Sequence, residues 1–194
     1  MKVAPMSAPH KTIACWTMIG LTLIAGCIPS LNPVYTDETL TFEPALIGVW
    51  KQPAAKARWH FAKLDDKTYR LSYTDDEGQQ GRFLGRLAKL DNELFLDLYP
   101  EEVKLDGNGF YKFHLVPIHT IYRVKQADGQ LNLSAIDFQW LDDYLNSHPT
   151  EIETATFNGR KMITGPTPAV QKFVLAHKEM FTNDFDLRKI ESSN

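Results

Sequence analysis

Two histidines, His114 and His119, lie close together in the chain, and with a carboxylate they could form a metal or acid–base site. Both fall in a segment, Phe110 to Lys125, that has the apolar character of a strand. Side chains of a strand alternate between its faces, so these two diverge unless Pro117 introduces a bulge. A site would also need an acid from another strand, such as Asp137. We therefore expect one internal and one solvent-facing histidine, and we predict no metal site.

The other polar residues form no catalytic pattern. No serine lies in a Gly-x-Ser-x-Gly context. Adjacent acids such as Asp142-Asp143 and Glu101-Glu102 are expected to be solvated, and neighbouring positions of a helix diverge. The segment Asp106-Gly107-Asn108-Gly109 lacks the later ligands of a calcium loop, so a plain turn is expected. We predict no catalytic residue, no cofactor and no enzyme; an enzyme would need His114 and His119 to converge with an acid.

The chain has two cysteines, and Cys27 stands directly after an apolar run. Residues 1–11 carry two lysines and no acid, residues 12–26 are mostly apolar, and two small residues precede Cys27. A basic region, an apolar region and a small-residue cleavage site are typical of a secretory signal peptide. The run is shorter than the roughly 20 residues that a membrane-spanning helix needs. The alternative, an uncleaved anchor helix, is disfavoured by that length and by the abrupt change of composition at Pro29.

The sequence Leu23-Ile24-Ala25-Gly26-Cys27 resembles the bacterial lipobox. The resemblance implies that residues 1–26 are removed, that the sulfur of Cys27 is lipidated and that its new amine is acylated. One acyl chain binds a membrane marginally, whereas several anchor it stably. By the same resemblance, Ile28 in place of aspartate favours the outer membrane, facing the periplasm. Cys15 would leave with the signal peptide, so neither a disulfide nor a thiolate metal site is expected.

Composition places the remaining chain in one folded domain. Hydrophobic residues make up 43% of the chain and aromatic residues 11%, enough for a substantial core. The net charge is −3 and becomes more negative if Lys2 and Lys11 are removed, so we expect no nucleic-acid partner. Residues 27–44, rich in Pro, Asn and Thr, are expected to form a lipidated tether. Residues 45–194 are expected to form a single β-rich globular domain.

Alternation of apolar and polar residues predicts strands through most of this domain. Tyr69, Leu71 and Tyr73 share one face of residues 68–74, for example. Further strands are expected over residues 46–52, 57–64, 82–90, 93–99, 110–125 and 131–137, with one or two more between 150 and 164. Helical spacing predicts helices over 138–146 and 168–180. We expect a mainly β (β+α) fold: an antiparallel barrel or strongly curved sheet of about eight strands, with two helices near the C-terminus.

The tripeptide Gly48-Val49-Trp50, at the start of the first of these strands, resembles the G-x-W signature of the lipocalins and the wider calycin group. The resemblance implies a calycin-like barrel, with Trp50 plugging its closed end. It also implies a basic side chain over the tryptophan, for which Arg160 or Arg123 is the candidate by cation–π packing. One departure is clear: lipocalins place their prominent helix after the eighth strand, whereas residues 138–146 precede the last strand-like segment here.

Aromatic residues are frequent on the expected strands. They are core residues if the barrel is filled, and they line an apolar pocket if one end is open. In the second case Trp59, Tyr69, Tyr73, Phe83 and Tyr122 would contact a ligand. We therefore expect an outer-membrane lipoprotein that binds a hydrophobic small molecule or lipid. The alternative is a non-catalytic module for an envelope protein complex, docking through the helix from residue 168 and through residues 140–145.

Overall fold

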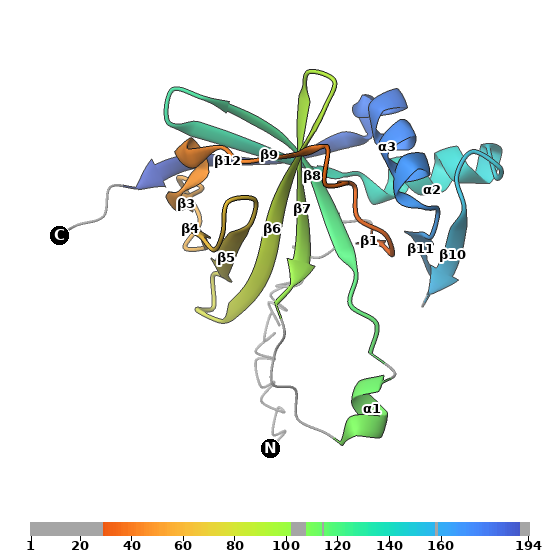
Figure 1. Ribbon diagram of the computed structural model, residues 1–194, viewed down its shortest axis with the longest axis horizontal. Coiled ribbons are helices and arrows are strands. Elements are labelled where there is room, and N and C mark those ends of the chain that lie inside the picture. The colour runs from red at the N-terminus through yellow and green to blue at the C-terminus, as the bar shows by residue number, and fades with distance from the viewer. Residues whose placement is uncertain (1–28, 102–107, 114, 158, 191–194) are drawn as a thin grey trace, which may run out of the picture.

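The computed structural model describes residues 29–101, 108–113, 115–157 and 159–190 (Figure 1). Eight strands form a closed antiparallel barrel, because each pairs with the next along the chain and the last pairs with the first. The expected calycin-like barrel is thereby confirmed. Its strands are β3 (Gly48–Lys51), β4 (Arg58–Lys63), β5 (Tyr69–Thr74), β6 (Gln80–Leu90), β7 (Glu93–Pro100), β8 (His119–Ala127), β9 (Gln130–Ile136) and β12 (Phe181–Ile190).

An insertion separates β9 from the closing strand β12. It contains α2 (Phe138–Ser147), the hairpin of β10 (Thr154–Phe157) and β11 (Arg160–Ile163), α3 (Thr167–Ala176) and the 3-10 turn η2 (Lys178–Met180). The two predicted helices are confirmed near their expected bounds. The Asp137 carboxylate caps α2 by accepting a hydrogen bond from the Trp140 N–H at 2.9 Å.

The closing strand β12 was not expected from the sequence, in which no strand was predicted after the helix over 168–180. Its side chains alternate: Phe181 and Leu187 are buried, and Thr182, Asp184 and Asp186 between them are exposed. The barrel closes only because β12 returns between β9 and β3. The helix-before-strand order noted in the sequence therefore reflects an insertion before the eighth barrel strand.

The N-terminal segment packs against the barrel from residue 29 onward. Its elements are β1 (Pro29–Ser30), β2 (Leu40–Thr41) and the 3-10 turn η1 (Pro44–Leu46). β1 lies between β8 and β11, and the side chains of Ser30 and Val34 are fully buried. The expected tether over residues 27–44 is therefore wrong for residues 29–44. Backbone pairing and the burial of Val34 fix this segment despite its Pro- and Asn-rich composition.

Two apolar cores share the barrel wall. The interior core lies inside the barrel and takes side chains from all eight of its strands, among them Trp50, Phe61, Leu87 and Leu133. The outer core lies between the outer face of β6, β7 and β8, the N-terminal segment and the insertion; its members include Val34, Phe95, Ile121, Leu141 and Phe173. Figure 1 shows α2, α3 and the β10–β11 hairpin gathered on one side of the barrel.

A long connection joins β7 to β8 and carries the short helix α1 (Gly109–Phe113), which stands away from the barrel in Figure 1. The expected strand over residues 110–125 is therefore too long at its start, since β8 begins at His119. Pro117 lies just before that start, where a residue without an N–H removes no ladder hydrogen bond. Within the described ranges, no helix is long and apolar enough to cross a membrane.

Candidate functional site

Trp50, on β3, belongs to the interior core of the barrel. Its side chain is fully buried, and its indole N–H donates to the Leu46 carbonyl at 2.8 Å. The Nζ atom of Lys189, on β12, lies 5.3 Å from the centre of the Trp50 ring. Gly48 makes this approach possible, because a Cβ on it would lie 2.6 Å from the Lys189 Cε. Its φ of +133° is also one that side-chain-bearing residues rarely adopt.

A basic side chain does lie over Trp50, as predicted, but it belongs to Lys189 and to neither Arg160 nor Arg123. Arg123 instead forms a two-bonded ion pair with Glu93, both bonds at 2.9 Å, which holds the pKa of that carboxyl below its usual range. Arg160 is exposed on β11, which pairs with β10 and β1 rather than with a barrel strand near Trp50. Lys189 was missed because β12 was missed.

The five aromatic residues predicted to bind a ligand all belong to the interior core or pack against it. Trp59, Tyr69 and Tyr122 are buried, whereas Tyr73 and Phe83 are half-buried at its margin. Their rings contact one another: Trp59 lies 4.9 Å from Tyr73 and 6.0 Å from Tyr122 between ring centres. Side chains therefore occupy the volume in which the pocket was expected, and the interpretation of these residues as core fits the packing.

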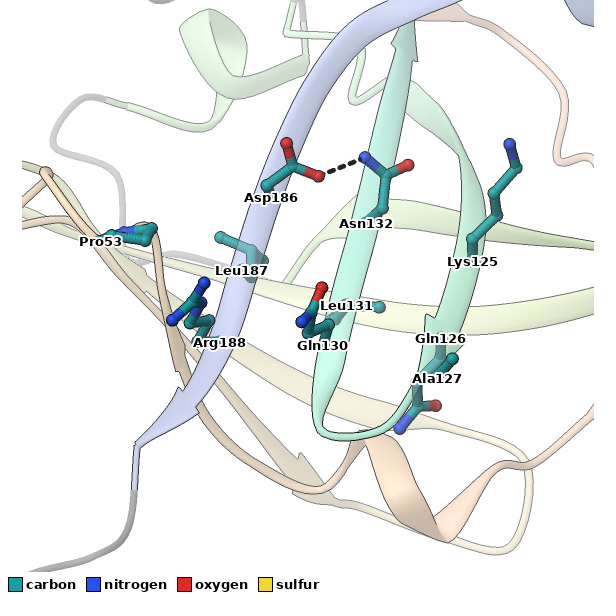
Figure 2. A pocket seen from close by; sticks show the side chains of 10 residues that line it. All are labelled: Pro53, Lys125, Gln126, Ala127, Gln130, Leu131, Asn132, Asp186, Leu187 and Arg188. Atoms are coloured by element: carbon teal, nitrogen blue, oxygen red, sulfur yellow. Dashed lines mark hydrogen bonds between the residues drawn. The ribbon is translucent and has the colours of Figure 1, made fainter.

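A groove of about 460 Å³ lies on the outer surface of β8, β9 and β12. Figure 2 shows polar side chains around it, with the Asn132 amide donating to Asp186 at 2.8 Å. Lys125, Gln130 and Arg188 also line it. None of the five predicted aromatic residues lines this groove. Its mixed polar and apolar lining, which contains no aromatic residue, differs from the aromatic site that the sequence led us to expect.

One histidine does meet a buried acid, but the partner is not Asp137. The Nδ1 of His119 lies 2.6 Å from Oδ1 of Asp97, a residue on β7 that is 1% exposed. The second oxygen of Asp97 accepts from the Val34 N–H at 2.9 Å. The carboxylate thus links a barrel strand, a histidine and the N-terminal segment. Asp137 is the cap of α2, and His114 lies outside the described residues.

The surroundings of this pair are aromatic and basic. The His119 ring lies 4.6 Å from that of Tyr99 and 6.5 Å from that of Tyr35. Arg86 donates to the Tyr35 hydroxyl at 2.8 Å; burial raises the pKa of Tyr35, and the guanidinium partly opposes this. Ser30 faces His119 across the β1–β8 pairing, but its hydroxyl donates to the Asn32 carbonyl at 2.6 Å. The carboxylate orients the imidazole as in catalytic triads, but among the described residues no nucleophile is hydrogen-bonded to that imidazole.

Residues able to hold a metal do not cluster in the part of the chain that the structure describes. No three His, Cys, Asp or Glu side chains come together there as a metal site. Cys27, the predicted lipidation site, and part of the Asp106-Gly107-Asn108-Gly109 turn lie outside the described residues.

The two helices that were predicted to dock a partner bury most of their apolar side chains inside the protein itself. Val170, Phe173 and Val174 of α3, with Leu141 and Leu145 of α2, belong to the outer core. One row of rings stays half-buried or exposed on α2, and we name Trp140, Tyr144 and His148 the aromatic ladder. Consecutive rings stack at 4.8 Å and 4.3 Å, as their four-residue helical spacing allows.

The side chain of His177 packs against the middle of the aromatic ladder. Its ring lies 4.5 Å from Tyr144. Its nitrogens face Glu151 at 3.6 Å and Glu179 at 3.4 Å. The ladder is therefore a firmly supported, amphipathic surface with acidic groups at its edge, the composition that favours contacts with another protein.

Comparisons with family models, with curated proteins and with solved structures returned no significant match to the chain. The class is therefore defined by the fold alone: a closed, calycin-like antiparallel barrel with an insertion before its eighth strand.

Proposed function

We propose that this chain is a bacterial lipoprotein, anchored through Cys27 in the outer membrane and facing the periplasm. Its calycin-like domain is a non-catalytic interaction module that docks an envelope protein through the aromatic ladder. The observation that carries this choice over ligand transport is the filled barrel interior, to which all eight strands contribute side chains. The lipobox resemblance supports the location, and the ladder supports the mode of docking.

A hydrophobic ligand inside the barrel would have to displace well-packed rings. Interiors are packed to the density of organic crystals, so a guest molecule needs an existing cavity or a costly rearrangement. Trp59 and Tyr122 contact each other and Phe185, on the opposing strand β12. This network favours a structural role for the five aromatic residues.

The aromatic ladder has the features of a recognition surface. Trp140 and Tyr144 present large rings at low entropic cost, because stacking and the helix backbone already hold them. Lys161 braces the same helix by donating to the Asp142 carboxylate at 2.8 Å and to Asn146 at 2.6 Å. A rigid aromatic row of this kind can dock with little reorganisation.

Site-specific photo-crosslinking in cells tests the docking proposal. A photoreactive residue at His148, the exposed end of the ladder, should trap one protein partner in near-stoichiometric yield. The same group at Glu77, in the exposed turn after β5, should not. Trp140→Ala should reduce the yield at His148, whereas Asp143→Ala, exposed on the same helix, should leave it unchanged. Equal products from both positions would contradict the proposal.

Fatty-acid titration tests the competing interpretation. The purified protein should show no saturable binding of a fluorescent fatty acid. Saturable binding that Tyr73→Ala or Phe83→Ala changes, and that Tyr144→Ala does not, would return the function to hydrophobic-ligand binding.

The anchor itself is tested by mass spectrometry of the protein extracted from membranes. The proposal expects an N-terminal residue Cys27 that carries acyl chains, and an unprocessed or unacylated product in Cys27→Ser. An unchanged acylated mass in that variant would exclude Cys27 as the anchor.

A further inference from the structure

The strand β10 forms an open edge of the sheet. It pairs on one side with β11, and among the described residues no strand pairs with its other side. Figure 1 shows β10 at the outer margin of the insertion, farther from the barrel than β11. The hairpin is held in place, because the Lys161 Nζ on β11 donates to the Asp142 carboxylate of α2 at 2.8 Å. Closure of the barrel leaves its own strands paired, whereas β10 exposes backbone groups along one side.

The direction of these backbone groups follows from the register of the hairpin. The Glu153 carbonyl accepts from the Thr164 N–H at 2.9 Å, so the backbone of Glu153 faces the β11 side. Backbone groups alternate in direction along a strand, so those of Ala155 also face β11 and those of Thr154 and Thr156 face away from it. The N–H and carbonyl groups of these two threonines therefore point out of the sheet edge.

Strand β10 carries none of the features that usually prevent pairing at an edge. Its sequence, Thr-Ala-Thr-Phe, contains no lysine and no proline, and its pairing with β11 is regular throughout. Three of its four side chains are exposed, among them Phe157 at 69%. Threonine and phenylalanine also favour an extended backbone. This edge is therefore suited to receive another strand.

We propose that the strand received here is β10 of a second copy of the chain, in an antiparallel arrangement with a two-fold axis at Ala155. In this register Thr154 of one protomer lies opposite the partner's Thr156, and each such pair exchanges two N–H···O bonds. One symmetric contact therefore satisfies the outward-facing groups of both threonines in both protomers. The two sheets become continuous across the dimer.

Side chains at the two ends of β10 favour a second copy over an unrelated strand. The two-fold axis places Glu153 opposite the partner's Phe157, which pairs with Arg160 in its own hairpin. These three side chains share one face of the joined sheet, so Glu153 and the partner's Arg160 lie about 10 Å apart between Cα atoms, with the phenyl ring between them. Glu153 and Arg160 are exposed in the single protomer. In the dimer their opposite charges meet over the ring and cover it.

The proposed contact is small compared with a permanent dimer interface. Four residues of each β10 meet, whereas stable interfaces take about 20–30 residues from each side. We therefore expect a reversible dimer whose fraction rises with protein concentration. It depends neither on the lipid anchor nor on the aromatic ladder.

Disulfide trapping tests the dimer. The full chain carries Cys15→Ser and Cys27→Ser, so that an introduced thiol is the only one, and it is kept in solution with a mild detergent. In Ala155→Cys the two Cα atoms at the two-fold axis would lie about 4.5 Å apart, within the reach of a disulfide. Mild oxidation should therefore give a covalent dimer on a non-reducing gel. Glu77→Cys, in the exposed turn after β5, is the control and should stay monomeric.

Two further variants test the register. Thr154→Cys alone, or Thr156→Cys alone, places its two thiols at diagonal positions about 7–8 Å apart between Cα atoms and should give little dimer. A mixture of the two proteins should give much more, because these positions lie opposite each other at about 5.5 Å. Equal yields from the separate proteins and from the mixture would overturn the two-fold register.

A proline and a charge exchange test the contact itself. Thr156→Pro removes an outward N–H without removing a bond to β11, so it should abolish the dimer trapped through Ala155→Cys. Glu153→Lys should lower the trapped yield, and adding Arg160→Glu should restore it. Circular dichroism and the urea midpoint should match those of the parent protein in each variant, which separates a lost contact from a lost fold.

The proposal is overturned if Ala155→Cys gives no more dimer than Glu77→Cys. Oxidation in cells supplies a second decisive outcome. If Ala155→Cys is trapped there to another protein and not to its own copy, the edge receives an extended segment of that protein, and the second copy is the wrong occupant.

Discussion

The interior core and the outer core are built on the two faces of the same barrel, yet they differ in polarity. The interior core is apolar and aromatic, and the polar group of Trp50 is satisfied by the nearby Leu46 carbonyl. The outer core adjoins a buried polar pair, Asp97 with His119. A barrel buries the inner face of its strands by closing on itself, whereas its outer face is buried only where other segments cover it. The Asp97–His119 pair lies where one such covering segment, the N-terminal segment, contacts the barrel.

Strand β7 is covered on both faces, and the burial of its residues shows this. Four consecutive residues, Phe95 to Leu98, are buried, because alternate side chains enter the interior and the outer layer. Asp97 is the outward-facing member of this run whose carboxylate meets the backbone of Val34. Burying a carboxylate costs free energy unless hydrogen bonds satisfy its oxygens. The contacts of Asp97 with His119 and with the Val34 N–H therefore hold the N-terminal segment against the barrel in one arrangement.

The largest effect is expected in the interior core. Trp50→Ala removes a fully buried ring, its hydrogen bond to Leu46 and its contact with Lys189, and should lower the free energy of unfolding by about 3–5 kcal/mol. Urea denaturation followed by circular dichroism measures this. Trp140→Ala, which removes a half-buried ring of the aromatic ladder, is the control and should cost clearly less. A larger loss in Trp140→Ala would reverse the ranking of the two regions.

The outer core should depend most on the contact between Asp97 and His119. Asp97→Leu leaves His119 and the Val34 N–H without their acceptor and should cost about 3 kcal/mol. The double variant Asp97→Leu, His119→Leu should be more stable than the single one, because it no longer buries an unpaired imidazole. Urea unfolding of the parent protein, Asp97→Leu, His119→Leu and the double variant checks this. If the two single effects simply add, the pair is not coupled and the fastening role is wrong.

A smaller, pH-dependent effect is expected where the N-terminal segment meets the barrel end. The Tyr69 hydroxyl accepts from the Glu43 N–H at 2.6 Å and donates to the Glu43 carbonyl at 3.0 Å. Tyr69→Phe should cost about 1 kcal/mol at neutral pH. Burial raises the pKa of Tyr69 to about 12, although the Glu43 N–H opposes this.

The sign of the pH dependence follows from that pKa. Below pH 10 tyrosine is protonated in both folded and unfolded chains, so the stabilisation is complete there. Between pH 10 and about 12 only the unfolded chain ionises, and stability falls by about 1.4 kcal/mol per pH unit from this group. Tyr69→Phe should lose this part of the alkaline decline in urea titrations. An unchanged slope would show that Tyr69 is not responsible.

The smallest effect concerns the cover of Trp50. Lys189→Met removes an exposed cation from the ring and should cost only about 0.5 kcal/mol. Lys189→Arg should keep the contact and serve as the control. Differential scanning calorimetry resolves the change; a loss as large as that of Trp50→Ala would mean that the cation contributes as much stability as the ring.

Much of the barrel could be predicted because each strand repeats a local pattern. Tyr69, Leu71 and Tyr73 alternate with polar residues, and the barrel buries the first two fully and the third in part. The helices were predictable from the helical spacing of their apolar residues and, for α3, from the proline in its first turn. Apolar and polar residues also alternate in β12, where Phe181, Phe185 and Leu187 are the apolar members. The strand was still not predicted, because it is rich in charged residues and no turn signal separates it from the preceding helix.

The candidate sites were less predictable than the fold. Lys189 covers Trp50 only because β12 lies beside β3, and Asp97 meets His119 only because β7 pairs with β8. The aromatic ladder could have been found from the spacing of Trp140, Tyr144 and His148 along one helix. Which side of that helix remains exposed depends on the barrel wall that covers the other side.

The sequence by itself determined the alternation of the strands, the apolar spacing of the two helices and the Gly48-Val49-Trp50 start, because these depend on neighbours within a few residues. It also carries the Cys27 signature, on which the proposed membrane location depends. The tertiary structure alone decided that the barrel interior is filled, that residues 29–44 are part of the fold and that Lys189 and Asp97 have the partners they do. Those outcomes arise from contacts between residues far apart in the chain, and only closure of the barrel brings them together.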